Sequence, residues 1–212
     1  MLSAEQVLGF LAAAVLLTAT PGPDNLMVLG IGMSRGRRAG MAFGLGCALG
    51  CLSHTLLAVL GGGALIAASP AAFTALKWAG GGYLVWLGVQ AWRHAGAVRI
   101  GQPDGGAGAR VDTPARLFAK GLLANAVNPK VVLFFLALLP QFVVPAAGAV
   151  PLQMALLGLI FTAQAAALFE LLGAFSGVIG AALMRRPGAG RWLDRLAAAV
   201  FTLLGLRLAL AG

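Results

Sequence analysis

The chain has 212 residues, of which 60% are hydrophobic and 10% are charged, and its mean hydropathy is +0.92. Soluble domains carry roughly a quarter of charged residues, so this composition excludes a soluble globular protein and indicates an integral membrane protein. Fifteen Lys and Arg against six Asp and Glu give a net charge of +9. The basic residues stand in short clusters between apolar runs, without interleaved aromatic residues, and this pattern argues against a nucleic-acid partner.

Six apolar runs are long enough to cross a bilayer, which takes about 20 residues of helix. We predict spans at 7–33, 40–67, 72–92, 117–143, 152–183 and 192–210. Most of the basic residues fall in or beside the first, third and fifth connections between these runs. By the positive-inside rule these connections are cytoplasmic, and both chain termini lie outside. The chain is therefore expected to cross its membrane several times.

The chain divides into two halves around a polar stretch rich in Gly and Pro. We expect a first three-helix membrane repeat over 1–92, a flexible basic cytoplasmic linker over 93–116 and a second three-helix repeat over 117–212. Because each half has three spans, the halves cross the bilayer in opposite directions. The predicted fold is therefore an all-α integral membrane protein with six transmembrane helices, built as two inverted repeats. Thr113-Pro114 is suited to begin the fourth span as cap and first-turn proline.

The first span of each half is interrupted by prolines and polar residues. These interruptions are Thr20-Pro21-Gly22-Pro23-Asp24-Asn25 and Asn125-Ala126-Val127-Asn128-Pro129-Lys130. At 1.5 Å per residue both fall at a similar depth in the bilayer. Paired broken helices in corresponding positions of inverted halves indicate a transporter's substrate site, whereas two ordinary proline kinks are the structural alternative. The candidate substrate-binding residues are Pro21, Gly22, Pro23, Asp24, Asn25, Asn125, Asn128, Pro129 and Lys130.

Two charges of opposite sign stand at the interruptions, and each costs about 2.5–3.5 kcal/mol to insert at this depth. A zwitterion such as an amino acid offers an ammonium group for Asp24. Its carboxylate suits Lys130, or the first backbone N–H groups of the following half-helix at Leu26 and Met27. The alternative is an internal Asp24–Lys130 salt bridge that only holds the helices together.

Further polar residues inside the apolar runs are candidates for other roles. Asp24, His54 and Glu170 are candidate proton carriers, and Glu170 is a solvated edge charge if it lies near the inner end of its span. Cys47, Cys51 and His54 follow i, i+4, i+7 spacing and share one helix face, which also suits a soft metal ion. Buried packing is the alternative for both cysteines.

Enzyme motifs such as GxSxG, HExxH, Walker A or a Gly-rich dinucleotide loop do not occur, so we expect no enzyme and no cofactor. Transport must then draw on an ion gradient or on the substrate's own gradient.

The chain resembles the LysE/RhtB family of bacterial amino-acid exporters over essentially its whole length. The resemblance is carried by both interruptions, by the Gly-rich run with His54, by Leu76-Lys77 leading to Gly80-Gly81-Gly82-Tyr83-Leu84, and by the stretch 118–142 with Phe134-Phe135 and Pro140-Gln141-Phe142.

The resemblance implies an inner-membrane carrier that exports amino acids by proton antiport. Thr20-Pro21-Gly22-Pro23 looks like the threonine/homoserine branch, which implies neutral substrates such as threonine, homoserine or leucine. The lysine/arginine branch typically carries GPQN where this chain has Gly22-Pro23-Asp24-Asn25. The partners implied are an amino acid, protons and the lipid bilayer, with a homodimer left open. Metal exporters belong to the wider superfamily, so a divalent metal-ion exporter is the alternative function.

Overall fold

The computed structural model describes residues 2–62, 70–93, 95, 112–185 and 187–210, and the regular structure in these ranges is entirely helical. The elements are α1 (Ala4–Ala19), α2 (Pro23–Arg35), α3 (Arg37–Leu57), the π-helical turn η1 (Ala58–Gly62), α5 (Pro70–Arg93), α6 (Pro114–Ala126), α7 (Pro129–Leu133), the π-helical turn η2 (Phe134–Leu138), the 3-10 turns η3 (Leu139–Phe142) and η4 (Pro145–Ala147), α8 (Val150–Ala174), α9 (Ser176–Arg185) and α10 (Pro187–Leu210).

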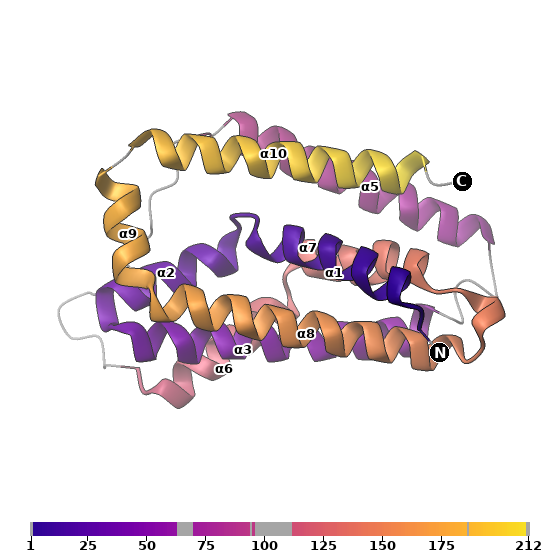
Figure 1. Cartoon of the computed structure of the whole chain (residues 1–212), viewed down its shortest axis with the longest axis horizontal. Helices are drawn as coiled ribbons and strands as arrows, with labels where there is room; N and C mark the ends of the chain where they lie inside the picture. Colours follow the sequence, from indigo (N-terminus) through magenta and orange to yellow (C-terminus); the bar gives the residue numbers. More distant parts are fainter. Residues whose placement is uncertain (1, 63–69, 94, 96–111, 186, 211–212) are drawn as a thin grey trace.

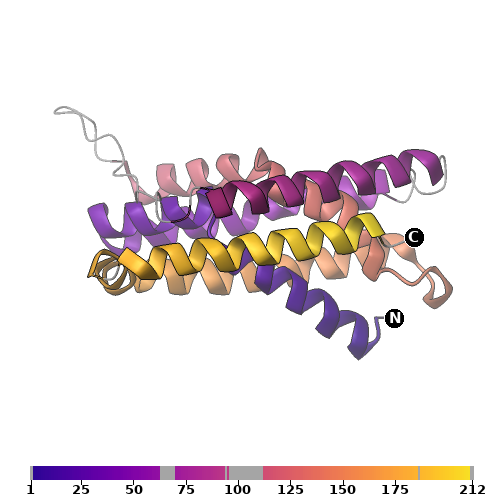
Figure 2. The ribbon, with the colours of Figure 1, turned by 90° about the horizontal axis from the view of Figure 1, so that it is seen from above.

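The helices form two groups. α5 and α10 pack against each other along their length and form one layer, while α1 to α3 and α6 to α9 form the other (Figures 1 and 2). α3 is central to the larger group, because α2, α6 and α8 all pack against it. The start of α1 and the end of α10 lie at the same end of the molecule (Figure 1).

Glycines let two helix pairs approach at backbone distance. A Cβ added at Gly46 of α3 would collide with the Phe118 carbonyl of α6, and one added at Gly121 of α6 would collide with the Phe43 carbonyl of α3. α5 and α10 meet in the same way, since a Cβ on Gly81 would lie 2.7 Å from a backbone oxygen of α10. Small residues permit this approach, which suits membrane helices because van der Waals packing holds them together.

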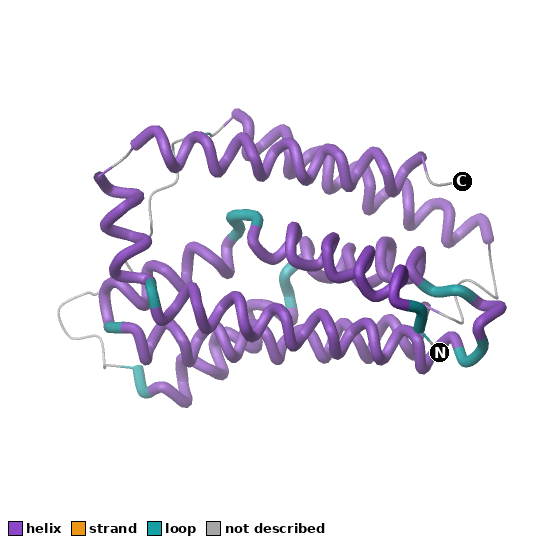
Figure 3. The backbone as a smooth tube through the Cα atoms, viewed as in Figure 1, coloured by secondary structure: helices purple, strands orange, loops and turns teal. Residues whose placement is uncertain are grey.

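Two helix pairs are broken at the predicted interruptions. α1 and α2 are bent by 55° across residues 20–22, and α6 and the following segment from α7 to η3 are bent by 49° across residues 127–128. Figure 3 shows both breaks as loop segments in the middle of the helical bundle. In each case proline takes the first position of the new helix, where its missing N–H removes no hydrogen bond. Both interruptions are therefore complete helix breaks.

By length and apolar character, α8 and the segment 37–61 qualify as membrane spans on their own, and each bent pair qualifies as one more. The runs predicted at 72–92 and 192–210 form α5 and α10, which fall short of this criterion among the described residues.

The prediction of one continuous span at 152–183 was wrong. The helix stops at Phe175, which leaves helical geometry at φ −100° and ψ 11°, and α9 then turns away from α8 (Figure 1). α9 packs against α2, where a Cβ on Gly32 would collide with the Ser176 side chain. The docking of α9 on α2 accounts for the excess length of this run over a bilayer's thickness.

The predicted cytoplasmic connections gather at one end of the molecule. The α2–α3 junction, the start of α6 and the end of α9 lie together there (Figure 1). Asp112, just before α6, ties two of these elements together. Its Oδ2 accepts hydrogen bonds from Arg35 of α2 at 3.0 Å and from Lys120 of α6 at 2.7 Å.

The linker predicted at 93–116 lies mostly outside the described residues, and its two edges are helical rather than flexible. α5 extends to Arg93, and α6 begins at Pro114. Thr113 caps α6, because its side chain accepts a backbone N–H of the first turn at 3.3 Å. The predicted cap and first-turn proline are thus confirmed.

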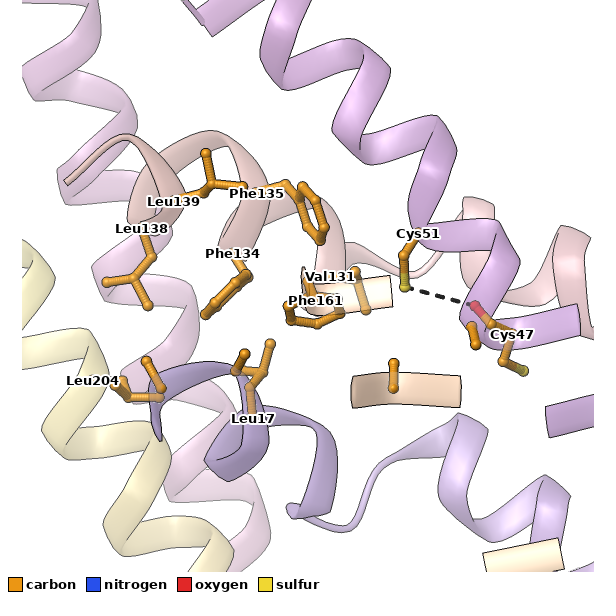
Figure 4. Packing of buried hydrophobic residues seen from close by; sticks show 14 of the residues in the cluster. Leu17, Cys47, Cys51, Val131, Phe134, Phe135, Leu138, Leu139, Phe161 and Leu204 are labelled. Carbon is orange, nitrogen blue, oxygen red and sulfur yellow. Dashed lines mark hydrogen bonds between the residues drawn. The ribbon is translucent and has the colours of Figure 1, made fainter. Parts of the chain in front are cut away.

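The core centres on aromatic side chains beside the breaks. Phe134 and Phe135 of η2 meet Phe161 of α8 with ring centroids 5.1 Å and 4.9 Å apart, and Phe10 of α1 lies 5.8 Å from Phe134. Figure 4 shows this group facing Leu17, close to the end of α1. The rings form an aromatic cluster, and one of them, Phe161, also lines the cavity beside the two breaks.

Candidate functional site

The first break presents a buried carboxylate. Pro21 lacks an N–H and so cannot continue α1, Gly22 is extended, and Pro23 starts α2, which places Asp24 in the first turn of the new helix. Asp24 is 6% exposed. The N-terminus of a helix carries partial positive charge, so this position stabilises a carboxylate.

The second break supplies the partners of that carboxylate. The side-chain amide of Asn125, in the last turn of α6, donates to Asp24 Oδ2 at 2.8 Å, and that of Asn128 donates to the same oxygen at 3.0 Å. Asn128 also caps α7, because its side-chain oxygen accepts the Lys130 N–H at 3.1 Å. The two breaks, expected at similar depth, are in direct contact.

Lys130 is buried, with 7% exposure, but it is not paired with Asp24. Its Nζ donates to the Thr20 carbonyl at 3.0 Å and lies 5.1 Å from the centroid of the Phe201 ring of α10. Asp24 and Lys130 are both described, and no salt bridge joins them. The C-terminus of α1 carries partial negative charge and favours this ammonium group.

Between the two charges lies a small cavity of about 20 Å³, which is room for roughly one water molecule. Seven predicted site residues line it: Gly22, Pro23, Asp24, Asn25, Asn125, Asn128 and Lys130. Pro21 and Pro129 are not part of its lining and act on the backbone instead, by ending α1 and starting α7. The apolar wall consists of Leu17, Val131, Phe161, Ala165 and Phe169.

The backbone donors named for the substrate carboxylate were wrong in part. The Leu26 N–H already donates to the Gly22 carbonyl at 3.0 Å, and Met27 lies one residue further into α2. The N–H groups without an acceptor inside the helix at this end belong to Asp24 and Asn25, because only the first turn leaves its donors open. The pattern had placed the start of α2 too late.

α3 holds Asn125 from behind. His54 Nε2 lies 3.0 Å from the Asn125 carbonyl oxygen, which identifies Nε2 as the protonated nitrogen, and the Cys51 thiol donates to Asn125 Oδ1 at 3.4 Å. All three side chains are at most 1% exposed. Cys51 therefore orients the side-chain amide that binds Asp24, and His54 holds the backbone of the same residue. The sequence pattern did not predict these positioning roles.

The candidate proton carriers lie at different places. Asp24 lines the cavity, whereas His54 lies behind Asn125. Glu170 is half-buried, four residues before the end of α8, and does not line the cavity. This position favours the interpretation of Glu170 as an edge charge.

The metal interpretation of Cys47, Cys51 and His54 finds no support. Both cysteines are buried free thiols, and the Cys51 thiol also lies 3.7 Å from the Cys47 carbonyl oxygen (Figure 4). Across the described part of the chain, no three His, Cys, Asp or Glu side chains are placed to hold a metal ion.

Several residues of the site were missed. Thr18 lines the cavity, Gln164 of α8 donates to the Thr18 hydroxyl at 2.9 Å, and Asn25 donates to the Thr18 carbonyl at 2.8 Å. Phe201 covers Lys130 from α10. Gln164 is a polar residue in an apolar run, which is a usable signal, but the Thr18 and Phe201 roles depend on packing that the pattern does not contain.

A profile of the LysE type translocator family matches residues 15–212. The chain belongs to this family. The matched range includes both breaks and every residue of the cavity, and it confirms the resemblance noted in the sequence. Family membership and the apolar helices together make the chain a helical membrane protein.

Several relatives of this chain are named as efflux proteins. A homoserine/homoserine lactone efflux protein of Salmonella typhimurium is 36% identical over 136 residues, and the match spans 64% of each chain. A threonine efflux protein of Salmonella typhi is 30% identical over 209 residues, which cover 95% of this chain and 97% of the relative. A leucine efflux protein of Klebsiella pneumoniae is 29% identical over 136 residues, 64% of this chain and 62% of that protein. No solved structure matches the chain.

Proposed function

We propose that this translocator exports neutral amino acids from the cytoplasm across the bacterial inner membrane. The observation that carries the proposal is the pair of buried, unpaired charges of opposite sign that face one cavity where two broken helices meet. The names of the homoserine, threonine and leucine efflux relatives support the same substrate class.

The proposed topology has six spans with both termini outside. α1 with α2, α3 with η1, α5, α6 with the segment from α7 to η3, α8 and α10 are the six crossings. The residues 1–92 and 117–212 then form inverted three-helix repeats, each with a broken first crossing. The similar bends of 55° and 49° and the gathering of basic connections at one end of the molecule support this arrangement.

In the proposed complex the substrate ammonium binds Asp24 and its carboxylate binds Lys130. Asp24 keeps the Asn125 and Asn128 amides on one oxygen, which leaves its other oxygen for the ligand. Lys130 makes one hydrogen bond to protein and has further N–H donors. The open Asp24 and Asn25 N–H groups add positive potential for the substrate carboxylate.

The proposed energy source is the proton gradient. Of the carboxylates described, Asp24 is the one that lines the cavity. A proton entering from outside binds Asp24 after the amino acid leaves, and the ammonium group of the next substrate displaces that proton into the cytoplasm. Proton and amino acid thus compete for one carboxylate, which is the requirement for antiport.

Transport by the purified protein in liposomes tests the proposal. Vesicles loaded with labelled homoserine, threonine, leucine or Cd²⁺ are given a pH gradient of either sign, and efflux is compared with that from protein-free vesicles. We expect amino-acid efflux to be faster when the outer medium is more acidic than the lumen and slower when the gradient is reversed. We expect no Cd²⁺ efflux. Cd²⁺ efflux without amino-acid efflux would establish the metal exporter instead.

A further inference from the structure

One pair of polar side chains beside the cavity is left incompletely hydrogen-bonded. Gln164 of α8 donates from Nε2 to the Thr18 hydroxyl at 2.9 Å, while its buried Oε1 has no partner. Thr18 is 6% exposed and lines the same cavity as Asp24. A buried carbonyl without a donor is unfavourable, so its presence needs an explanation.

The hydroxyl of Thr18 differs from those of the other buried threonines. The hydroxyls of Thr20, Thr55 and Thr162 each donate to the carbonyl four residues earlier in the helix. The Thr18 hydroxyl accepts from Gln164 and donates to no acceptor in the described ranges. Its hydrogen therefore remains available at the wall of the cavity.

Both possible orientations of the Gln164 side-chain amide leave one hydrogen-bond donor and one acceptor of the pair open. With Gln164 Nε2 directed at Thr18, the Thr18 hydroxyl hydrogen and Gln164 Oε1 are open, which gives one donor and one acceptor. With the amide turned over, Thr18 donates to Oε1, and the open groups are the Gln164 Nε2 donor and the Thr18 oxygen. Either arrangement suits a group that both donates and accepts a hydrogen bond.

The pair is fixed relative to the charge site. The Asn25 side chain donates to the Thr18 carbonyl at 2.8 Å, so the end of α1 is tied to the turn that carries Asp24. The surrounding wall is apolar, with Phe161, Ala165 and Phe169 on the same helix as Gln164. Thr18 lines the cavity, whereas Gln164 does not and holds the Thr18 hydroxyl from behind. A ligand side chain that leaves Asp24 along this wall therefore meets the Thr18 hydroxyl as its polar contact.

We propose that Thr18, held in place by Gln164, binds the side-chain hydroxyl of a small hydroxy amino acid and so selects it over aliphatic substrates. This inference rests on the proposed function, because it places the α-amino group at Asp24. A hydroxyl both donates and accepts, so it satisfies the open group of Thr18 in either placement of the Gln164 amide. A methyl or methylene group leaves that group unpaired, and a charged side chain brings an ion that it does not neutralise.

Competition between close analogues tests the selection. Homoserine and threonine both become 2-aminobutyrate when the hydroxyl is removed, so this compound is the matched ligand. The unmutated protein in liposomes is expected to take homoserine or threonine about 5- to 150-fold better than 2-aminobutyrate in competition, the range set by leaving a buried polar group unpaired. Thr18→Val and Gln164→Met keep side-chain size and should bring this ratio close to one.

Thr162→Val is the control variant, because the Thr162 hydroxyl is also buried on α8 but already donates to Gly158 and does not line the cavity. It should keep the full ratio. An unmutated protein that carries all three ligands without preference would refute the selection while leaving amino-acid export intact, and this measurement needs no variant to fold. An unchanged ratio in both Thr18→Val and Gln164→Met would refute it equally. Transport of none of the three would instead refute the proposed function.

Discussion

Neutralising Asp24 should remove substrate binding without unfolding the protein. Asp24→Asn keeps the shape of the side chain, and its amide oxygen can still accept from Asn125 and Asn128. Hydrogen bonds to a charged group contribute about 1.5–3 kcal/mol and neutral ones about 0.5–1.5, so two weakened bonds reduce stability by about 2 kcal/mol, partly offset because no charge is buried. We expect the variant to insert and fold.

The effect on binding should be larger. With no cation of the described chain within ion-pair distance of Asp24, the ammonium group must come from the ligand. Truncating one member of a buried pair costs about 3–5 kcal/mol, which is more than a hundredfold in affinity. Counterflow of labelled homoserine into liposomes, competed by unlabelled ligand, measures this loss.

Altered ligands separate the two charges. The homoserine analogue that has a hydroxyl in place of the ammonium group should bind the Asp24→Asn variant and the unmutated protein equally well. In the same way, the amide analogue that lacks the carboxylate should bind the Lys130→Gln variant and the unmutated protein equally well. The double variant should stay inactive. Lys120→Gln serves as control, because Lys120 pairs with Asp112 at the molecular end and does not line the cavity. Efflux near the unmutated level in the double variant, or equal losses for all three ligands, would refute the charge assignment.

Three further predictions concern topology and stability. A reporter active only in the cytoplasm should be active when fused after residue 101 and silent after residue 147; the opposite pattern would invert the proposed orientation. Gly46→Ala should lower the free energy of unfolding in SDS by about 1–3 kcal/mol, because the added Cβ collides with a backbone carbonyl of α6. Gly82→Ala is the control, since no heavy atom lies within 4 Å of its added Cβ, and it should change the free energy of unfolding by less than about 0.5 kcal/mol. Hydrogen bonds from Lys120 and then from Arg35 lower the pKa of Asp112, so its stabilising contribution is present above about pH 4 and disappears as the pH falls through the lowered pKa. The difference in melting temperature between Asp112→Asn and the unmutated protein should therefore vanish in acid, and a difference that persists there would contradict the ion pairs as its source.

The two breaks were predictable because proline and glycine act through their own backbone. Pro21, Pro23 and Pro129 each remove an N–H, and any helix through them must stop or bend there, whatever surrounds it. Charge counting in the connections likewise needs no tertiary information, and the basic connections do gather at one end. Local chemistry thus located the cavity to within a turn of helix.

The partners inside the site were not predictable from spacing. The sequence left an internal Asp24–Lys130 salt bridge open as the alternative to substrate binding, but Lys130 binds the Thr20 carbonyl and the face of Phe201. A residue of α10 enters the site only because α10 packs beside α5 and contacts α1, long-range contacts that no pattern of 3.6 residues encodes. The end of the 152–183 run at Phe175 depended in the same way on the docking of α9 against α2.

The small cavity lies where hydrogen bonds join the two breaks. α1 and α2 contribute Thr20 and Asp24, and the other bent pair contributes Asn125, Asn128 and Lys130, so three hydrogen bonds join the two breaks. About 20 Å³ holds a water molecule but no amino acid, so in the proposed transport cycle the breaks separate when a substrate enters. Separation gives up bonds to charged groups of about 1.5–3 kcal/mol each, and the ammonium and carboxylate of a zwitterion replace them with ion pairs to the same two residues. A ligand with a single charge forms an ion pair with only one of these two residues. On the proposed function, substrate binding and movement of the bent helices are coupled through Asp24 and Lys130, and a zwitterion is the ligand class that leaves neither charge uncompensated in the open state.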